Sequence, residues 1–218
     1  GTEEAFKQSM KSYQACLDQV IDVFGQDFCN SLILNAGGSS TYPLYNRSDE
    51  QSKFITEIAT ASALVKPTDF DTQTLTHHKP ACFIATPVLK LVDKPEIPML
   101  KGLSKFLQTL GLLPKKACFI YGGNWLASPC FPTDSKRSKI FGHSSNQEMY
   151  ELKNDHSLKV DDYFFFRPTQ SEAVFLQLGN IAVYEKNKII DWWPVFHDET
   201  HDKITGEKNQ GIKGDSII

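Results

Sequence analysis

The sequence has no excess of basic residues, and this absence excludes two common classes of partner. Its 218 residues include 23 Lys and Arg and 26 Asp and Glu, which gives a formal net charge of −3 at pH 7. Neither a basic footprint for nucleic acid nor a polybasic segment for anionic lipid can be found. We therefore expect no nucleic acid and no membrane among the partners.

Long apolar runs and paired cysteines are also lacking. No apolar stretch approaches the roughly 18 residues of a membrane-spanning helix, and the charged start GTEEAFKQSM does not read as a signal peptide. The cysteines are odd in number, scattered and without a CxxC pair: Cys16, Cys29, Cys82, Cys118 and Cys130. This usage predicts reduced thiols and a cytoplasmic location.

What the sequence does contain is an apolar run that stops at a glycine pair. The run Leu32–Leu34 has the length of one buried strand. The residues that end the stretch are Gly37, Gly38, Ser39, Ser40 and Thr41. Glycines let the backbone approach an anion, while amides and hydroxyls supply hydrogen-bond donors. The stretch 31–41 therefore predicts a strand ending in a phosphate-binding loop, although an ordinary turn has the same composition.

The residues around this stretch predict an α/β unit with parallel strands. Apolar residues spaced by three and four from 3 to 24, followed by Gly25, indicate an amphipathic helix. The run Phe54–Val65 predicts a second buried strand that carries one carboxylate, Glu57. An exposed polar face of that strand is the alternative place for Glu57. In such folds, ligands gather at the carboxyl ends of the strands.

The remainder of the chain predicts a mostly antiparallel β domain with one helix over Met99–Leu110. Short β-branched and aromatic runs are separated by Pro, Gly, Asn and charged turns. The predicted strands are 82–91, 117–121, 163–167, 173–178, 181–184 and 189–193. From Asp198 onward the sequence is polar and predicts a tail. The expected divisions are therefore 1–70, 71–197 and 198–218.

Two clusters of histidine are candidate metal ligands. His77 and His78 are adjacent, and a second group contains His197, Asp198, Glu199, His201 and Asp202. Neither group lies on a regular element with a third ligand at a definite spacing. A solvated turn and a solvated tail are the favoured interpretations.

Three polar stretches follow predicted strands or join them. They are YGGNW at 121–125, SSNQE at 144–148 and RPTQSE at 167–172. Glycines and hydrogen-bonding side chains at such places suit either ligand contact or simple turns. Composition leaves both interpretations open.

The order of these motifs resembles the C-terminal half of the D-serine dehydratase-like and D-threonine aldolase-like family. The matching text is AGGSST, ITEI at 55–58, YGGNW, SSNQE, RPTQSE and DWWPVF at 191–196, within residues 25–197. The last three motifs are most similar to the amino acid deaminase or alanine-racemase-domain branch. The resemblance implies a fold-type III enzyme that uses pyridoxal 5'-phosphate. It also implies the last βα units of an alanine-racemase-type (β/α)₈ barrel, followed by a C-terminal β domain.

By the same resemblance, Gly37, Gly38, Ser39, Ser40 and Thr41 match the loop that holds the cofactor phosphate. This agrees with the donors that the loop offers. The ITEI strand would be the last of the barrel, and Glu57 would lie near its mouth. The role of Glu57 stays open because the sequence Ala59–Ser62 that follows departs from the family.

The sequence departs from the family most clearly at Pro168–Glu172. Zinc-dependent members carry a Pro-x-His-x-Cys pattern there, whereas this chain has Gln170 and Glu172. An amide and a single carboxylate are poor substitutes for imidazole and thiolate. We expect no catalytic zinc in this chain, and we assign Gln170 and Glu172 to the substrate's polar groups or to positioning a water.

The resemblance also implies a lysine that forms the Schiff base, on a barrel strand upstream of every match. The lysines considered in its place are Lys53, Lys66, Lys79 and Lys90, all in predicted loops or strand ends. None is a good candidate, because a Schiff-base lysine needs a buried, positioned amine. Together with a start at Gly1 instead of Met, this leads us to expect the second half of a longer enzyme, completed by its own N-terminal half.

The sequence thus predicts part of a pyridoxal-phosphate enzyme that acts on a D-amino acid. Deamination or dehydration, retro-aldol cleavage and racemisation remain open as the reaction, with an amino acid as substrate. A homodimer is implied by the resemblance alone. The alternative is a non-catalytic, β-rich binding or dimerisation module that retains the fold without the chemistry.

Overall fold

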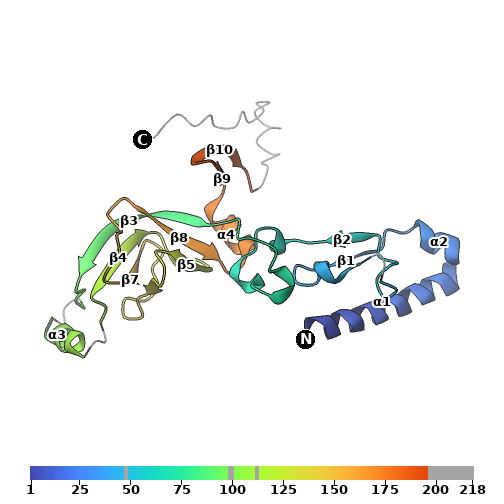
Figure 1. Ribbon diagram of the computed structural model, residues 1–218, viewed down its shortest axis with the longest axis horizontal. Helices are drawn as coiled ribbons and strands as arrows, with labels where there is room; N and C mark the ends of the chain where they lie inside the picture. Colours follow the sequence, from blue (N-terminus) through green and yellow to red (C-terminus); the bar gives the residue numbers. More distant parts are fainter. Residues whose placement is uncertain (47–48, 98–100, 111–112, 196–218) are drawn as a thin grey trace. The chain divides into compact units, whose positions relative to one another are not determined.

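The computed structural model describes residues 1–46, 49–97, 101–110 and 113–195 (Figure 1). Two compact units divide the chain, Gly1–Gln170 and Ser171–Ile218. No helix among the described residues is long and apolar enough to cross a membrane. The predicted tail at 198–218 lies outside the described residues, and the domain divisions expected from the sequence stay predictions.

The first helix confirms the sequence pattern almost to the residue. Helix α1 spans Thr2–Phe24 and buries Phe6, Met10 and Leu17. It ends at Gly25, which has a φ of 86° and donates its amide to the Ile21 carbonyl over 2.8 Å. Glycine accepts this positive φ without steric cost.

The predicted buried strand at Leu32–Leu34 is wrong. Helix α2 (Gln26–Ser31) occupies the residues before it, and strand β1 begins only at Asn35 and ends at Gly37. Ile33 is 73% exposed. Leu34 instead fixes the entry to the strand, because its amide donates to Thr56 Oγ1 and its carbonyl accepts from the Thr56 amide.

The second predicted strand is also much shorter than its apolar run. Strand β2 covers Glu57–Ala59 and pairs with β1 in parallel, with Asn35 opposite Glu57 and Gly37 opposite Ala59. The parallel pairing is as predicted, but further barrel strands are not part of the described chain. Small residues after Ala59 turn the backbone into 3₁₀ helix η2 (Ser62–Leu64), so the strand does not continue to Val65.

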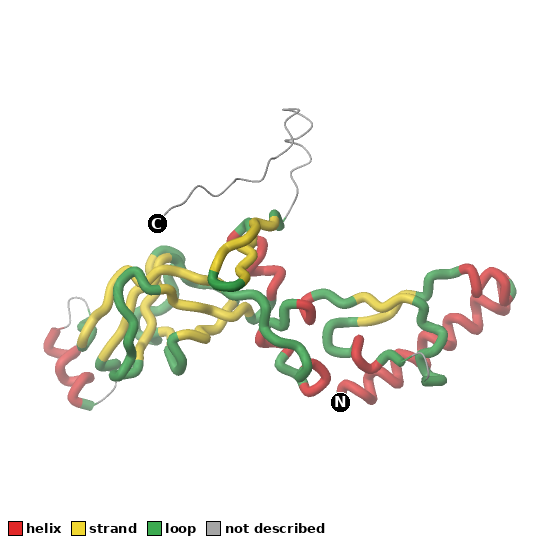
Figure 2. Tube along the Cα trace, turned by 45° about the horizontal axis from the view of Figure 1, so that its top comes forward, coloured by secondary structure: helices red, strands yellow, loops and turns green. Residues whose placement is uncertain are grey.

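The prediction of an antiparallel β domain is confirmed. Among the described residues, six strands form one sheet in the order β5-β8-β3-β4-β7-β6, and every pairing between these strands is antiparallel. Strands are yellow in Figure 2, where those of this sheet lie side by side. The strands are β3 (Ile84–Asp93), β4 (Lys116–Tyr121), β5 (Ala127–Phe131), β6 (Lys136–Arg137), β7 (Gln147–Leu152) and β8 (Tyr163–Pro168). Helix α3 (Lys101–Thr109) matches the predicted helix, although Met99 lies outside the described residues.

Aromatic side chains fill the core of this sheet. Phe164 and Phe166 are fully buried and stack with ring centroids 4.9 Å apart. Tyr150 on β7 packs against both rings at 5.1 Å. Such burial explains why the very apolar run at 163–167 was recognisable as a strand.

The second unit contains one incorrect prediction and two confirmed strands. Residues 173–178 form helix α4 (Ser171–Leu178), not a strand. The run contains good helix formers and is followed by Gly179, whose φ of 75° is typical of a helix end. The predicted strands at 181–184 and 189–193 are confirmed as β9 (Ile181–Glu185) and β10 (Lys188–Trp193). They pair with one another in antiparallel through a turn at Lys186 and Asn187, in which both φ angles are positive.

Four short 3₁₀ helices follow β1 and β2 in the described part of the first unit. They are η1 (Tyr42–Leu44), η2, η3 (Thr68–Phe70) and η4 (Gln73–Leu75). Leu75 is completely buried and anchors the last of them.

Candidate functional site

The glycine loop Gly37–Thr41 follows β1 at the carboxyl end of the parallel pair. Gly37 has a φ of 145°, and a Cβ there would lie 2.1 Å from the Ala59 carbonyl oxygen on β2. Gly38 has a φ of 118°, and a Cβ added there would lie 3.1 Å from the Thr41 hydroxyl oxygen. Close packing against β2 alone thus accounts for glycine at position 37.

Hydrogen bonds within the loop fix its shape. The Gly38 amide donates to the Ala59 carbonyl over 3.1 Å. The Thr41 amide donates to the Gly38 carbonyl over 3.0 Å, and its hydroxyl donates to the Gly37 carbonyl over 3.1 Å. Thr41 therefore shapes the loop, with both of its donors engaged inside it.

Two later segments brace the serines of the loop. Ser39 Oγ accepts from the Ala63 amide over 3.2 Å, and the Thr74 hydroxyl donates to the Ser40 carbonyl over 2.8 Å. Within the described residues, the amides of Ser39 and Ser40 donate to no protein acceptor. Both residues are half-buried. Two amides and two hydroxyl protons thus remain available to an anion.

Tyr42, which directly follows the loop, contacts both histidines of the adjacent pair. Its hydroxyl lies 3.1 Å from His77 Nε2 and in hydrogen-bond contact with His78 Nε2. The two imidazole rings are 4.5 Å apart between centroids. The pair is thus part of an ordered cluster, and the solvated turn favoured from the sequence is only half right, since His77 is exposed and His78 half-buried.

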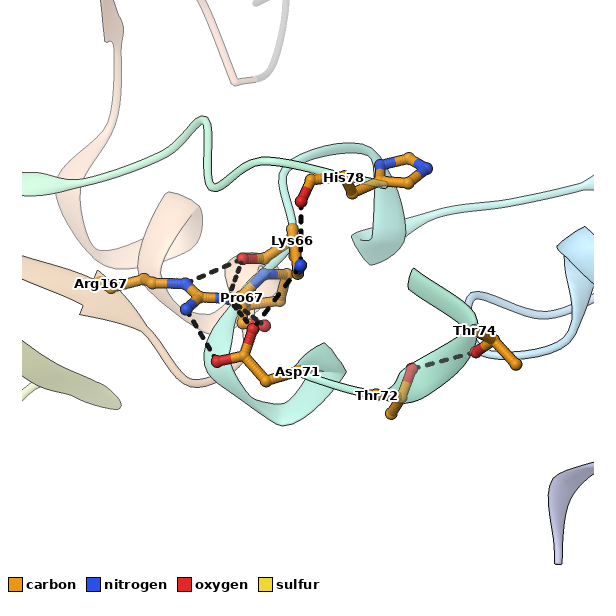
Figure 3. A network of polar contacts seen from close by, with 7 residues as sticks. All are labelled: Lys66, Pro67, Asp71, Thr72, Thr74, His78 and Arg167. Carbon is orange, nitrogen blue, oxygen red and sulfur yellow. Dashed lines mark hydrogen bonds and ion pairs between the residues drawn. The ribbon is translucent and has the colours of Figure 1, made fainter. Parts of the chain in front are cut away.

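Arg167 joins strand β8 to the segment after η2 through a network drawn in Figure 3. Its guanidinium donates to the Lys66 carbonyl over 2.8 and 3.0 Å, to the Pro67 carbonyl over 3.2 Å, and to both oxygens of Asp71 over 2.7 and 2.8 Å. This hydrogen bonding lowers the pKa of Asp71 below its usual range. An arginine within an apolar strand needs such partners, which is the signal that the sequence offered.

Lys66 is the buried lysine among the four considered from the sequence. Lys66 as a whole is 9% exposed, and its side-chain Nζ donates to the His78 carbonyl over 2.9 Å (Figure 3). Asp71 Oδ1 lies 4.0 Å from the same nitrogen. The sequence placed Lys66 in an unremarkable loop, and only the contacts with Asp71 and His78 distinguish it from Lys53, which pairs with Glu50 on the surface.

Glu57 is exposed on β2, as the alternative interpretation of the sequence had it. Its carboxylate accepts a hydrogen bond from the side-chain amide of Asn35, directly opposite on β1. This cross-strand pair ties together the two short parallel strands and gives Glu57 a structural partner.

The YGGNW and SSNQE stretches, which begin 23 positions apart in the sequence, lie against one another. The Gly122 amide donates to the Asn146 carbonyl over 2.7 Å, and the Glu148 amide to the Gly122 carbonyl over 3.1 Å. A Cβ on Gly123 would lie 2.4 Å from the Ser144 carbonyl oxygen. Gly123 therefore serves the close approach of these two segments.

Glu148 is buried at the centre of this contact, which sequence analysis missed by assigning 144–148 to a loop. One oxygen accepts from the Tyr150 hydroxyl over 2.7 Å and from the Asn124 amide over 3.2 Å. His143 Nδ1 lies 3.3 Å from the other oxygen. Burial raises the pKa of the Tyr150 hydroxyl far above its ordinary value, and the hydrogen bond to the Glu148 carboxylate raises this pKa further. The signal for burial was the run Met149-Tyr150, which continues β7.

Gln170 and Glu172 belong to different units. Gln170 ends the first unit and is exposed, while Glu172 is exposed in the first turn of α4, where the Ser171 hydroxyl donates to its carboxylate over 3.3 Å. In the part of the chain that the structure describes, no three side chains of His, Cys, Asp or Glu gather as a metal site. His197 and His201 lie outside the described residues.

A cleft of about 550 Å³ lies at the opposite end of β8 from Arg167. Phe131, Tyr163 and Phe165 supply its aromatic wall, and Lys153 and His156 are among its polar residues. It contains none of the site residues predicted from the sequence.

The comparisons with known proteins support a fold relationship. The structure is similar to that of a D-threonine aldolase from Filomicrobium marinum, with a TM-score of 0.52 and 10% sequence identity. The match covers 74% of this chain but only 40% of that one, so the chain spans about two fifths of that structure's length. No family model and no curated protein matches the sequence. The chain therefore shares part of the fold of a D-threonine aldolase.

Proposed function

We propose that this chain is the C-terminal portion of a pyridoxal-phosphate-dependent enzyme acting on D-amino acids, of the deaminase or dehydratase, aldolase or racemase type. The observation that carries the proposal is the Gly37–Thr41 loop. It ends a parallel strand with free amide donors, in a chain whose fold is similar to part of a D-threonine aldolase. The ordered motifs identified in the sequence support the same assignment.

The donors of the loop suit the phosphate group of the cofactor. The amides of Ser39 and Ser40 would hold phosphate oxygens, and the Ser40 hydroxyl would supply a further donor. The Ser39 hydroxyl accepts from the Ala63 amide, so its own proton remains free for the phosphate. Gly37, Gly38 and Thr41 would keep the backbone in the shape that exposes these donors.

The cofactor, when bound, withdraws electrons from the Cα of an amino acid. Gln170 and Glu172 are proposed to bind the polar groups of the substrate or to position a water, in place of the zinc ligands of the resembling family. A homodimer and a companion N-terminal half with the Schiff-base lysine complete the proposal.

Binding of pyridoxine 5'-phosphate tests the proposal without side reactions. This vitamer lacks the aldehyde and cannot react with lysines, so its affinity reports non-covalent recognition. We expect the chain to bind it more tightly than unphosphorylated pyridoxine, by calorimetry or equilibrium dialysis. Ser40→Ala should weaken only the phosphorylated ligand, by about 10- to 150-fold, since one charge-assisted hydrogen bond contributes about 1.5–3 kcal/mol.

Ser128→Ala on β5 is the matched control, because it removes a serine hydroxyl outside the loop. Equal affinity for the two vitamers would contradict the cofactor assignment. That result would support the alternative, a non-catalytic module, which the exposed positions of Gln170 and Glu172 and the lack of a matched Schiff-base lysine also favour.

A further inference from the structure

Three potential metal ligands meet at one point beside the glycine loop. The Nε2 atoms of His77 and His78 both lie against the hydroxyl oxygen of Tyr42, and the His77 separation is 3.1 Å. We propose that Tyr42, His77 and His78 bind a divalent first-row transition-metal ion, such as Zn²⁺ or Cu²⁺. The site is separate from Pro168–Glu172, where the resemblance places the zinc of other proteins.

The convergence of two neighbouring histidines is the first argument. Successive side chains normally point in different directions along an extended chain. Here the backbone turns, with the His78 amide donating to the Leu75 carbonyl over 3.1 Å, and the two rings come within 4.5 Å of one another. The turn thus brings two imidazole nitrogens to the same oxygen atom.

The separation between Tyr42 Oη and His77 Nε2 agrees with coordination geometry. Zinc binds imidazole nitrogen at about 2.0–2.1 Å, so neighbouring ligand atoms of a tetrahedral site are about 3.3 Å apart. The 3.1 Å between Tyr42 Oη and His77 Nε2 is close to this edge. A small movement of the His78 ring would complete the triangle, and water would occupy the fourth position.

The backbone around the cluster is fixed from two sides. The Thr74 hydroxyl bonds to the Ser40 carbonyl, and Lys66 Nζ bonds to the His78 carbonyl. Leu75, which lies between Thr74 and His78 in the sequence, is completely buried. These contacts hold the backbone of the turn that carries the two histidines.

The ligand set also defines the class of ion. Imidazole suits Zn²⁺, Cu²⁺, Fe²⁺ and Ni²⁺, and the order of affinity among divalent ions peaks at Cu²⁺. On coordination, the phenol of Tyr42 forms a metal–oxygen bond and releases its proton to solvent. Affinity should therefore rise with pH.

The test titrates the chelator-stripped 218-residue chain with Zn²⁺ and Cu²⁺. We expect one ion bound per chain, and a phenolate-to-copper charge-transfer band with Cu²⁺. His77→Gln and His78→Gln should each weaken binding by about 100-fold. Loss of a residue that only supports a ligand costs about 10–100-fold, and loss of the ligand itself should cost at least as much. Tyr42→Phe should abolish the charge-transfer band and weaken Zn²⁺ binding.

Two variants separate this site from other histidines. His143→Gln changes an exposed histidine elsewhere, and the pair His197→Gln with His201→Gln removes the histidines of the C-terminal segment. Neither should change the affinity. Zn²⁺ should also protect His77 and His78 of the unaltered chain from ethoxyformylation, a measurement that does not depend on any variant folding.

The proposal is overturned if the unaltered chain binds neither ion or if Zn²⁺ fails to protect His77 and His78. Binding that follows His197 and His201 would also refute it. Unchanged affinity in Tyr42→Phe and His77→Gln would show a hydrogen-bonded cluster without a metal function. These outcomes are independent of pyridoxine 5'-phosphate binding.

Discussion

A single arginine connects two segments of the first unit that are about a hundred residues apart in sequence. Arg167 on β8 binds the Lys66 and Pro67 carbonyls and both oxygens of Asp71. Its side chain is only 14% exposed, whereas that of Asp71 is 50% exposed, so the bonds to the two carbonyls are better shielded from water than those to the carboxylate. The planar fork of donors is specific to arginine, and lysine cannot reproduce it.

Arg167→Lys should therefore lower the free energy of unfolding although it keeps the charge. We expect a loss of about 1–3 kcal/mol, because buried carbonyls lose their donors. Urea denaturation followed by circular dichroism measures this loss. Lys188→Arg on the exposed strand β10 is a control for the exchange itself and should change stability little.

Acid should remove part of the contribution of this network. The pKa of Asp71 is lowered in the folded chain, chiefly by the hydrogen bonds from Arg167. Its stabilising effect is complete above the unfolded pKa of about 4 and is lost as the pH falls through the lower folded value. Asp71→Asn should flatten this part of the stability profile, and an unchanged slope would contradict the pairing.

At the scale of elements, the glycine loop depends on two strands of three residues each. Isolated strand pairs of this size are marginal, so each backbone contact between β1 and β2 matters. The strands approach most closely at Gly37, where an added Cβ would lie 2.1 Å from the Ala59 carbonyl oxygen. The position is therefore sterically closed to any other residue.

Gly37→Ala should destabilise the chain by more than about 2 kcal/mol, the sum of a strained φ and a backbone clash. Gly142→Ala is the matched control, because Gly142 has a φ of 67° but no atom within 4 Å of a new Cβ. It should lose only about 1 kcal/mol, the cost of the left-handed backbone alone. Thermal denaturation of both variants makes the comparison, and equal losses would argue against the packing explanation.

At the scale of the whole chain, the five free cysteines differ in how far they are exposed to solvent, from helix α1 to the antiparallel sheet. Cys16 is exposed on α1, whereas Cys118 is completely buried on β4. Burial raises the pKa of Cys82 to about 11 and that of Cys118 to about 12. The reactive thiolate is therefore scarce both at half-buried Cys82 and at buried Cys118.

Thiol labelling should follow this order. With a disulfide reagent at about pH 8, on the order of a thousandth of Cys82 is ionised, so Cys16 should react first and Cys118 only after denaturation. Cys16→Ser should remove the fast phase. Rapid labelling of Cys118 in the folded chain, identified by mass spectrometry, would contradict the packing of β4.

The parts of the fold that the sequence predicted are those with strong local patterns. Helix α1, strands β3, β4 and β8 of the antiparallel sheet, and strands β9 and β10 all follow such patterns. Strands β5, β6 and β7 of the same sheet were not predicted. The errors at 32–34, 54–65 and 173–178 fall on apolar runs without clear alternation, where strand and helix look alike. Boundaries there depend on which neighbours bury the run.

The sequence by itself determined the glycine loop, because consecutive glycines and hydroxyl residues specify backbone freedom and donors locally. Only the tertiary structure decided which donors remain free, since Thr41, Ala63 and Thr74 engage their own partners. It also decided that Tyr42 meets His77 and His78, and that Arg167 meets Asp71. These contacts join residues 35 to about 100 positions apart, and no local pattern encodes a distance between side chains that far apart in the chain.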